Sequence, residues 1–236
     1  MGRARGARRE LIDHDPDRPG TEDRQYRLVA LHALRGEPQA AAAALRQLAA
    51  WKDTDDTELR SIHDGCVVIV RAAEGKPEQA LGHGLRALQS GIDSQGAAAE
   101  AVRDCWPDTL HAALTLARHD DAHRIIDLLA DRPPGHVPPY LRAQLARGRA
   151  LLNAAEGHHD SVETDLRTAI DAFATLRYPY WHAVTQTDLA AWHIDHDQPD
   201  HAIVLLEQAI ATLTPLRATP ALTRAEALTR TPAAAS

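Results

Sequence analysis

The chain has 236 residues, of which 44 % are hydrophobic and only 4 % aromatic, and its formal net charge is −7. This length allows a substantial buried core, and the acidic balance argues against a nucleic-acid-binding surface, because basic residues gather densely only in the first nine positions. Strong helix formers dominate and the main β-branched run is residues 67–70, so we expect an all-α protein without a sheet.

A short sequence mark recurs five times along the chain. It begins at residues 36, 75, 117, 157 and 197, in steps of 39, 42, 40 and 40 residues. Gly36, Gly75 and Gly157 suit the left-handed conformation in which many helices end, whereas Asp197 and Ala117 fit it less well. A proline or an acidic residue lies two or three positions after the first residue of each mark, as is typical of a first helical turn. The marks therefore predict helix–turn–helix corners in a solenoid of stacked helix pairs.

The expected elements follow from these corners in chain order. Residues 1–20 form a polar, Arg-rich arm that cannot support a core. We then expect helix pairs over 21–35 with 38–51, 55–74 with 77–90, 94–118 with 120–131, 138–156 with 159–177, and 179–196 with 199–214. Pro107 should kink or split its helix, residues 132–139 form a proline-rich connector, and a capping helix near 220–230 precedes a frayed tail.

An apolar stripe keeps the same register in each second helix. In the last pair, Ala202 and Ala209 lie seven residues apart on one face. Small residues at that spacing allow a neighbouring helix to approach closely. We predict that this face packs against the helix that carries Leu189 and Trp192.

The corners and their flanks resemble the tetratricopeptide motif. Its small residues are matched by Ala41, Ala80, Ala122 and Ala202, and its later alanine by Ala87, Ala169 and Ala209. The units are longer than the usual 34 residues. Residues 138–228 are similar to the C-terminal repeat region of ATP-binding LuxR-type transcriptional regulators and of adenylate or guanylate cyclases coupled to an AAA-type ATPase.

This resemblance implies a right-handed α-solenoid of about five tetratricopeptide-like pairs over residues 21–217, with a capping helix and tail over 218–236. It also implies a non-catalytic module that senses inducers or binds proteins in bacterial signalling or transcription regulation. The chain has no GxxxxGK[ST] loop and no basic helix–turn–helix after the last repeat. We therefore expect it to bind neither ATP nor DNA.

The first helices of the pairs are predicted to line a concave groove that receives a protein partner, a second copy of the chain or a small inducer. The expected lining residues are Tyr26, Ala30, Ile69, His111, Gln144, Arg147, Leu151, Thr187 and Ala191. Only Arg147 among them is a cation, so we do not expect a clamp for a peptide carboxylate. Gln144 and Arg147 are the predicted polar anchors of the groove.

Histidines suggest an enzymatic alternative. Five His-Asp dipeptides occur, as in metal-dependent phosphohydrolases of the HD class: His14-Asp15, His63-Asp64, His119-Asp120, His159-Asp160 and His196-Asp197. Three lie at successive corners, which we expect to be about 10 Å apart and too distant to share one ion. We therefore expect no metal, cofactor or catalytic residue, while the phosphohydrolase and a small-ligand sensor remain alternatives.

Several smaller features have both a structural and a functional interpretation. The tracts 158–160 and 193–197 could bind a surface metal weakly, but solvated corner residues are the simpler interpretation. Trp181 and Trp192 could stack on a ligand, but their spacing first indicates a core stripe. Cys66 and Cys105 lack any metal-binding spacing and indicate buried thiols. Without an apolar N-terminal segment or a membrane-length apolar run, we expect a cytoplasmic protein.

Overall fold

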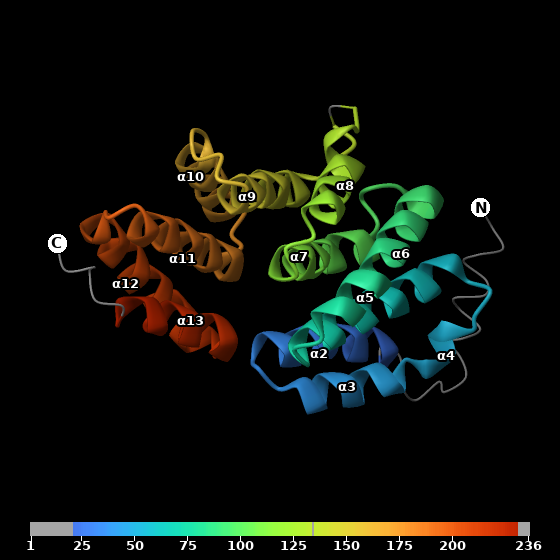
Figure 1. The fold of residues 1–236 in the computed structure, drawn as a ribbon. Helices are drawn as coiled ribbons and strands as arrows, with labels where there is room; N and C mark the ends of the chain where they lie inside the picture. The colour runs from blue at the N-terminus through green and yellow to red at the C-terminus, as the bar shows by residue number, and fades with distance from the viewer. Residues whose placement is uncertain (1–20, 134, 231–236) are drawn as a thin grey trace. The chain divides into compact units, whose positions relative to one another are not determined.

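The computed structural model describes residues 21–133 and 135–230. The predicted arm over residues 1–20 and the tail beyond residue 230 lie outside this part of the chain. All regular elements of the described part are helices, labelled α2 to α13 in Figure 1. The all-α prediction is confirmed.

The first six helices correspond closely to the expected pairs. They are α2 (Thr21–Leu34), α3 (Pro38–Gln47), α4 (Ala49–Lys52), α5 (Thr57–Ala73), α6 (Pro77–Gln95) and α7 (Glu100–Thr115). The predicted helix over 38–51 is broken at Leu48, and α6 extends five residues beyond its predicted end at residue 90. Pro107 lies inside α7 without splitting it, because α7 is continuous on both sides of that residue.

The last six helices follow the expected order as well. They are α8 (His119–Ala130), α9 (Pro139–Ala155), α10 (Val162–Thr175), α11 (Pro179–Asp195), α12 (Pro199–Leu216) and α13 (Thr219–Thr229). Each of α9, α11 and α12 begins at a proline, whose fixed φ suits a first helical turn. The predicted capping helix is present as α13.

The contacts divide the chain into two compact units, where the sequence predicted one repeat domain over residues 21–217. Among the described residues, unit 1 contains 21–33 and 37–112, and unit 2 contains 34–36, 113–133 and 135–230. The boundary falls within α7, which was expected to be an ordinary member of the repeat series. Each unit has its own buried residues.

All five predicted corners adopt the left-handed conformation. The φ angles are 75° at Gly36, 69° at Gly75, 52° at Ala117, 78° at Gly157 and 56° at Asp197. The prediction that helices end at these positions is therefore confirmed, including the two positions that lack glycine. An L-residue such as Ala117 adopts this conformation only at an energetic cost, so the surrounding helices must impose it.

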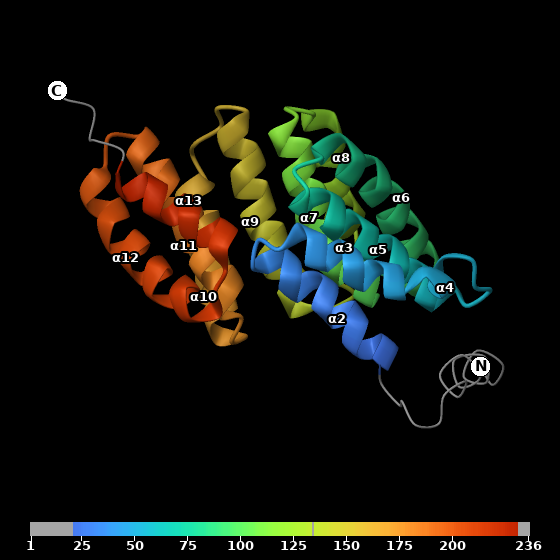
Figure 2. The same cartoon turned by 90° about the horizontal axis from the view of Figure 1, so that it is seen from below.

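Within each unit, consecutive helices pack side by side. The pairs α5–α6 in unit 1 and α9–α10 and α11–α12 in unit 2 are in contact (Figures 1 and 2), and α11 also contacts α10. The first helix of each of these pairs is buried on most of its surface, whereas the second has one buried and one exposed face. The first helices thus form the interior of the units.

The face of α12 that contains Ala202 and Ala209 is buried against α11, as predicted. Both alanines belong to a cluster with Ala183 and Ala190 of α11 and Leu213 of α12. Leu189 instead belongs to a separate cluster with Val162 and Leu166 of α10, and Trp192 packs against that cluster. The prediction that this face packs against the helix carrying Leu189 and Trp192, which is α11, is therefore confirmed. The residues of α11 in that contact are Ala183 and Ala190, whereas Leu189 and Trp192 pack with α10.

Replacing Ala202 with Phe is expected to destabilise unit 2 by about 1–3 kcal/mol, because a ring must enter a closely packed interface. Ala202 is only 1 % exposed. Urea unfolding followed by circular dichroism measures the change. Ala211→Phe on the exposed face of the same helix is the control, and equal midpoints for the two variants would contradict the packing described here.

Candidate functional site

Aromatic side chains are concentrated in one part of unit 2. Five of the nine aromatic residues of the chain form a cluster: Tyr140, Phe173, Tyr178, Tyr180 and Trp181. The ring centroids of Tyr140 and Tyr178 are 4.9 Å apart, and those of Tyr180 and Trp181 are 5.0 Å apart. In a chain with so few aromatic residues, this aromatic cluster is the most distinctive feature of the described surface.

The starts of two neighbouring first helices place these rings together. Tyr140 lies in the first turn of α9, directly after Pro138 and Pro139. Tyr180 and Trp181 lie in the first turn of α11, which follows Arg177 with its left-handed φ of 59°. Because α9 and α11 both pack against α10, their first turns lie close enough for the rings to meet.

The aromatic cluster is partly accessible. Tyr178 is 39 % exposed, Tyr180 and Trp181 are partly exposed, and Tyr140 and Phe173 are buried beneath them. The exposed rings therefore rest on a packed aromatic base. A rigid, partly exposed aromatic surface is typical of residues that contribute strongly to binding interfaces.

A buried ionic cluster adjoins the aromatic cluster. The Asp188 carboxylate, 2 % exposed, accepts a hydrogen bond of 2.7 Å from Arg147 Nε and one of 2.5 Å from Arg224 Nη1. Arg147 is also nearly buried, whereas the Arg224 side chain is 48 % exposed. The ionic cluster joins α9, α11 and α13, and it carries one more positive than negative charge.

The ionisation of Asp188 reflects these partners. Burial by itself raises the pKa of this carboxyl group. The charges and hydrogen bonds of Arg147 and Arg224 together lower it by more than burial raises it, so the pKa of Asp188 lies below its usual value. Asp188 therefore remains a carboxylate at neutral pH. Its two oxygens hold one guanidinium group each.

Arg147 links the ionic and aromatic clusters. Its guanidinium carbon lies 5.4 Å from the centroid of the Trp181 ring, within the range of a cation–π interaction. One turn earlier on α9, Gln144 donates a hydrogen bond of 3.0 Å to the Tyr140 hydroxyl. The Gln144 side-chain oxygen is buried and accepts no hydrogen bond.

The structure distributes the predicted groove residues over both units. Unit 1 contains Tyr26, Ala30, Ile69 and His111, and unit 2 contains Gln144, Arg147, Leu151, Thr187 and Ala191. Five of the nine are buried, namely Tyr26, Ile69, Gln144, Arg147 and Thr187, while His111 is exposed and the other three are intermediate. The five buried residues expose little of their surface in this structure. Their role in binding a partner stays a prediction.

Sequence reasoning missed Asp188 and Arg224, which hold the ionic cluster together. Asp188 lies among residues 183–190 of α11, all of which are buried. A carboxylate within such a helix needs a cationic partner, and this pattern could have indicated it. Unit 1 has a comparable polar contact between its helices, since the Tyr26 hydroxyl of α2 hydrogen-bonds Asp104 of α7, which also pairs with Arg103.

The two cysteines are buried, as predicted. Cys66 and Cys105 are both free thiols, and burial is the main cause that raises the pKa of each well above its usual value. Their thiolate forms are therefore scarce at neutral pH. A protonated, buried thiol is a poor nucleophile.

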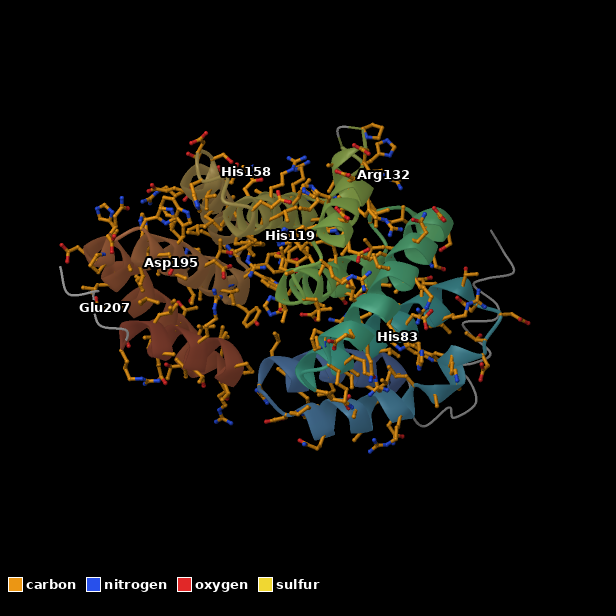
Figure 3. All side chains as sticks on the ribbon, viewed as in Figure 1. His83, His119, Arg132, His158, Asp195 and Glu207 are labelled. Carbon is orange, nitrogen blue, oxygen red and sulfur yellow. The ribbon has the colours of Figure 1, made fainter. Side chains whose placement is uncertain are left out.

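Side chains of the histidine-rich corners of unit 2 contact one another. His119 at the start of α8 lies 3.8 Å from Glu156 at the next corner, and the rings of His159 and His196 are 4.5 Å apart. Long side chains thus make contacts between successive corners, even though the corners were expected to be too distant to share one ion. His119 and His158, both labelled in Figure 3, each have Nδ1 close to a carboxylate oxygen of Glu156, at 3.8 and 3.7 Å. His14-Asp15 falls outside the described residues.

The other candidate metal ligands and the two candidate stacking tryptophans do not come together in one site. Across residues 21–133 and 135–230, no three His, Cys, Asp or Glu side chains surround one point as metal ligands would. Trp192 stacks on His196 with centroids 4.2 Å apart, whereas Trp181 belongs to the aromatic cluster, so the two tryptophans do not form a stacking pair. None of the described helices has the length and apolar character needed to cross a membrane.

Comparison with known proteins does not assign the chain to a family. No protein-family model matches the chain, and no curated protein matches it. The candidate site is therefore defined by the aromatic cluster and the ionic cluster of unit 2 alone.

Proposed function

We propose that this chain is a non-catalytic protein-interaction or sensor module of a cytoplasmic bacterial signalling or transcription-regulatory system. Its tetratricopeptide-like α-solenoid arrangement is part of the same proposal. The regular left-handed corners and the side-by-side packing of consecutive helices within each unit support this architecture. The resemblance of residues 138–228 to repeat regions of signalling ATPases supports the class of system.

The observation that carries the proposal is the exposed edge of the aromatic cluster. Binding energy at protein interfaces concentrates in a few Trp, Tyr and Arg residues. Here Tyr178, Tyr180 and Trp181 are accessible beside Arg147, and a buried base holds them in place. A surface already rigid before binding loses little conformational freedom when a partner docks.

Replacing Tyr178 with Ala is expected to raise the Kd for a captured protein partner about tenfold or more, since it removes an exposed ring at the centre of the contact. The partner is first isolated by affinity capture with the full wild-type chain. It is then titrated separately against the wild type and the Tyr178→Ala variant. Ile203→Ala on α12 is the control, because Ile203 is 51 % exposed but lies outside the aromatic cluster.

The same variants distinguish the small-ligand sensor from the interaction module. A metabolite that raises the unfolding midpoint of the wild type but not of Tyr178→Ala would favour the sensor. Equal partner affinity for the wild type and Tyr178→Ala would contradict the aromatic cluster as the contact surface.

A further inference from the structure

The ionic cluster of unit 2 offers more hydrogen-bond donors than its single carboxylate uses. Arg147 donates to Asp188 through Nε, and Arg224 donates to the other carboxylate oxygen through Nη1. The two terminal nitrogens of Arg147 have no hydrogen-bond partner among the described residues, and they are not fully buried. The Arg224 side chain is 48 % exposed. Because a guanidinium group carries donors on all three nitrogens, both arginines keep donors that a ligand can reach.

One positive charge of the ionic cluster also lacks a counter-charge within it. Arg147 is nearly buried, yet it shares the carboxylate of Asp188 with Arg224. A charge that is removed from water is costly unless it is paired. A second carboxylate beside the two guanidinium groups would complete the pairing, and the planar guanidinium fork favours this kind of contact.

The helices around the ionic cluster do not supply that second carboxylate. α9 contains three arginines and no acidic residue, and the first turn of α11 has no acidic residue either. In the part of the chain that the structure describes, neither Asp171 of α10 nor Glu226 of α13 forms an ion pair with Arg147 or Arg224. The starts of α9 and α11 also lack a side-chain cap, so no such group offsets their positive ends. This part of unit 2 is therefore electropositive, although the whole chain has a formal net charge of −7.

The exposed rings beside these arginines add further hydrogen-bond donors. Across residues 21–133 and 135–230, the Tyr178 hydroxyl and the Trp181 indole N–H have no hydrogen-bond partner, and both rings are at least partly exposed. Trp181 also lies against Arg147, which joins the aromatic cluster to the ionic cluster. A ligand that fits this surface has apolar groups for the rings and negatively charged oxygen atoms for the donors.

We propose that the aromatic cluster and the ionic cluster together bind an acidic peptide segment of a partner protein. An Asp or Glu side chain of the segment binds the accessible donors of Arg147 and Arg224, and its apolar side chains pack on Tyr178 and Trp181. This inference rests on the proposed interaction function and specifies the chemistry of the partner. The sequence did not indicate it, because Arg147 was the only cation of the expected groove and Arg224 lies outside that groove.

The test begins with random dodecapeptides displayed on phage, which are selected on the immobilised full chain after removal of phage that bind Tyr178→Ala. The selected peptides should be acidic, and one of their Asp or Glu residues should be essential. Replacing that residue with its amide in a synthetic peptide should raise the Kd about tenfold or more, because a hydrogen-bonded charge is lost. The affinity should also fall as the salt concentration rises.

Arg224→Gln should raise the Kd for the same synthetic peptide by a similar factor. Because this variant and the amide-substituted peptide remove the same contact, combining them should weaken binding little more than either change alone. Arg230→Gln is the matched control, since it removes an equal charge from an exposed residue at the end of α13, and it should bind as the wild type does. If circular dichroism shows that Arg224→Gln does not fold, the amide-substituted peptide still tests the proposal on the wild-type chain.

The possible failures separate this inference from the proposed function. Peptides that require Tyr178 but contain no essential acidic residue, or that bind Arg224→Gln as tightly as the wild type, would overturn the acidic partner and leave the proposed function intact. Tighter binding of an oligothymidylate, lost in the same variants, would also overturn it, because single-stranded nucleic acid combines anionic groups with stacking bases. Failure to select any peptide that depends on Tyr178 would count against both proposals.

Discussion

The Gly84→Ala variant is expected to be destabilised by about 3 kcal/mol, at the upper end of the usual cost of overpacking. A Cβ atom at residue 84 of α6 would lie 2.2 Å from Oγ1 and 2.4 Å from Cγ2 of Thr109. Thr109 is fully buried, and its hydroxyl donates a hydrogen bond of 2.7 Å to the Cys105 carbonyl oxygen. The side chain therefore cannot turn away without losing that bond, so α6 and α7 must move apart.

Gly82→Ala on the same helix is a matched control that is expected to raise stability, whereas Gly84→Ala lowers it. The nearest atom to its added Cβ is Arg86 Nη1 at 4.0 Å, so no clash arises. Alanine favours helix over glycine by about 1 kcal/mol, and this variant should become more stable. Urea unfolding measures both changes. A second substitution, Thr109→Ala, should partly rescue Gly84→Ala by removing the two closest atoms.

The Asp188→Asn variant is expected to lose about 3–5 kcal/mol of stability, the usual cost of removing one partner from a buried ion pair. Arg147 would then remain nearly buried without its carboxylate, and Arg224 would no longer fix α13 to α11. Asp195→Asn is the control, because Asp195 is an exposed carboxylate on the same helix (Figure 3). Similar unfolding midpoints for the two variants would contradict a structural role for the ionic cluster.

The effect of Asp188 should also depend on pH. The pKa of Asp188 is lower in the folded state than in the unfolded state. Its contribution to folding stability is therefore fully present above the unfolded-state pKa of about 3.9, and it is lost as the pH falls through the folded-state pKa. The difference in unfolding free energy between the wild type and Asp188→Asn should therefore be largest near neutral pH and shrink in acid. A constant difference across this range would show that Asp188 is not the titrating group.

The corners could be predicted from sequence because local conformation determines them. Gly36, Gly75 and Gly157 tolerate a left-handed φ. The repeat spacing of about 40 residues then predicted corners at Ala117 and Asp197, which are also left-handed. A second series of turns escaped notice because it lacks glycine. Arg177 and Arg217, 40 residues apart, are both left-handed with φ of 59° and 54°, and each follows a leucine.

The candidate site was harder to predict because burial depends on neighbours far apart in sequence. Arg147 stood out as the only cation of the expected groove, but its ion pair with Asp188 joins residues 41 positions apart, and Arg224, which binds the same carboxylate, lies a further 36 positions along the chain. The periodic pattern shows which face of a helix is apolar. It does not show that the other face of a first helix is also covered, which is why five residues of the expected groove are buried.

The most direct test of the proposed function is a hydrogen-exchange footprint of the captured partner on the full chain. Bound partner should slow exchange in the first turns of α9 and α11, around residues 139–145 and 179–185, and this protection should disappear in Tyr178→Ala. Protection confined to unit 1 or to the outer face of α12, with no change around these two helix starts, would contradict the account.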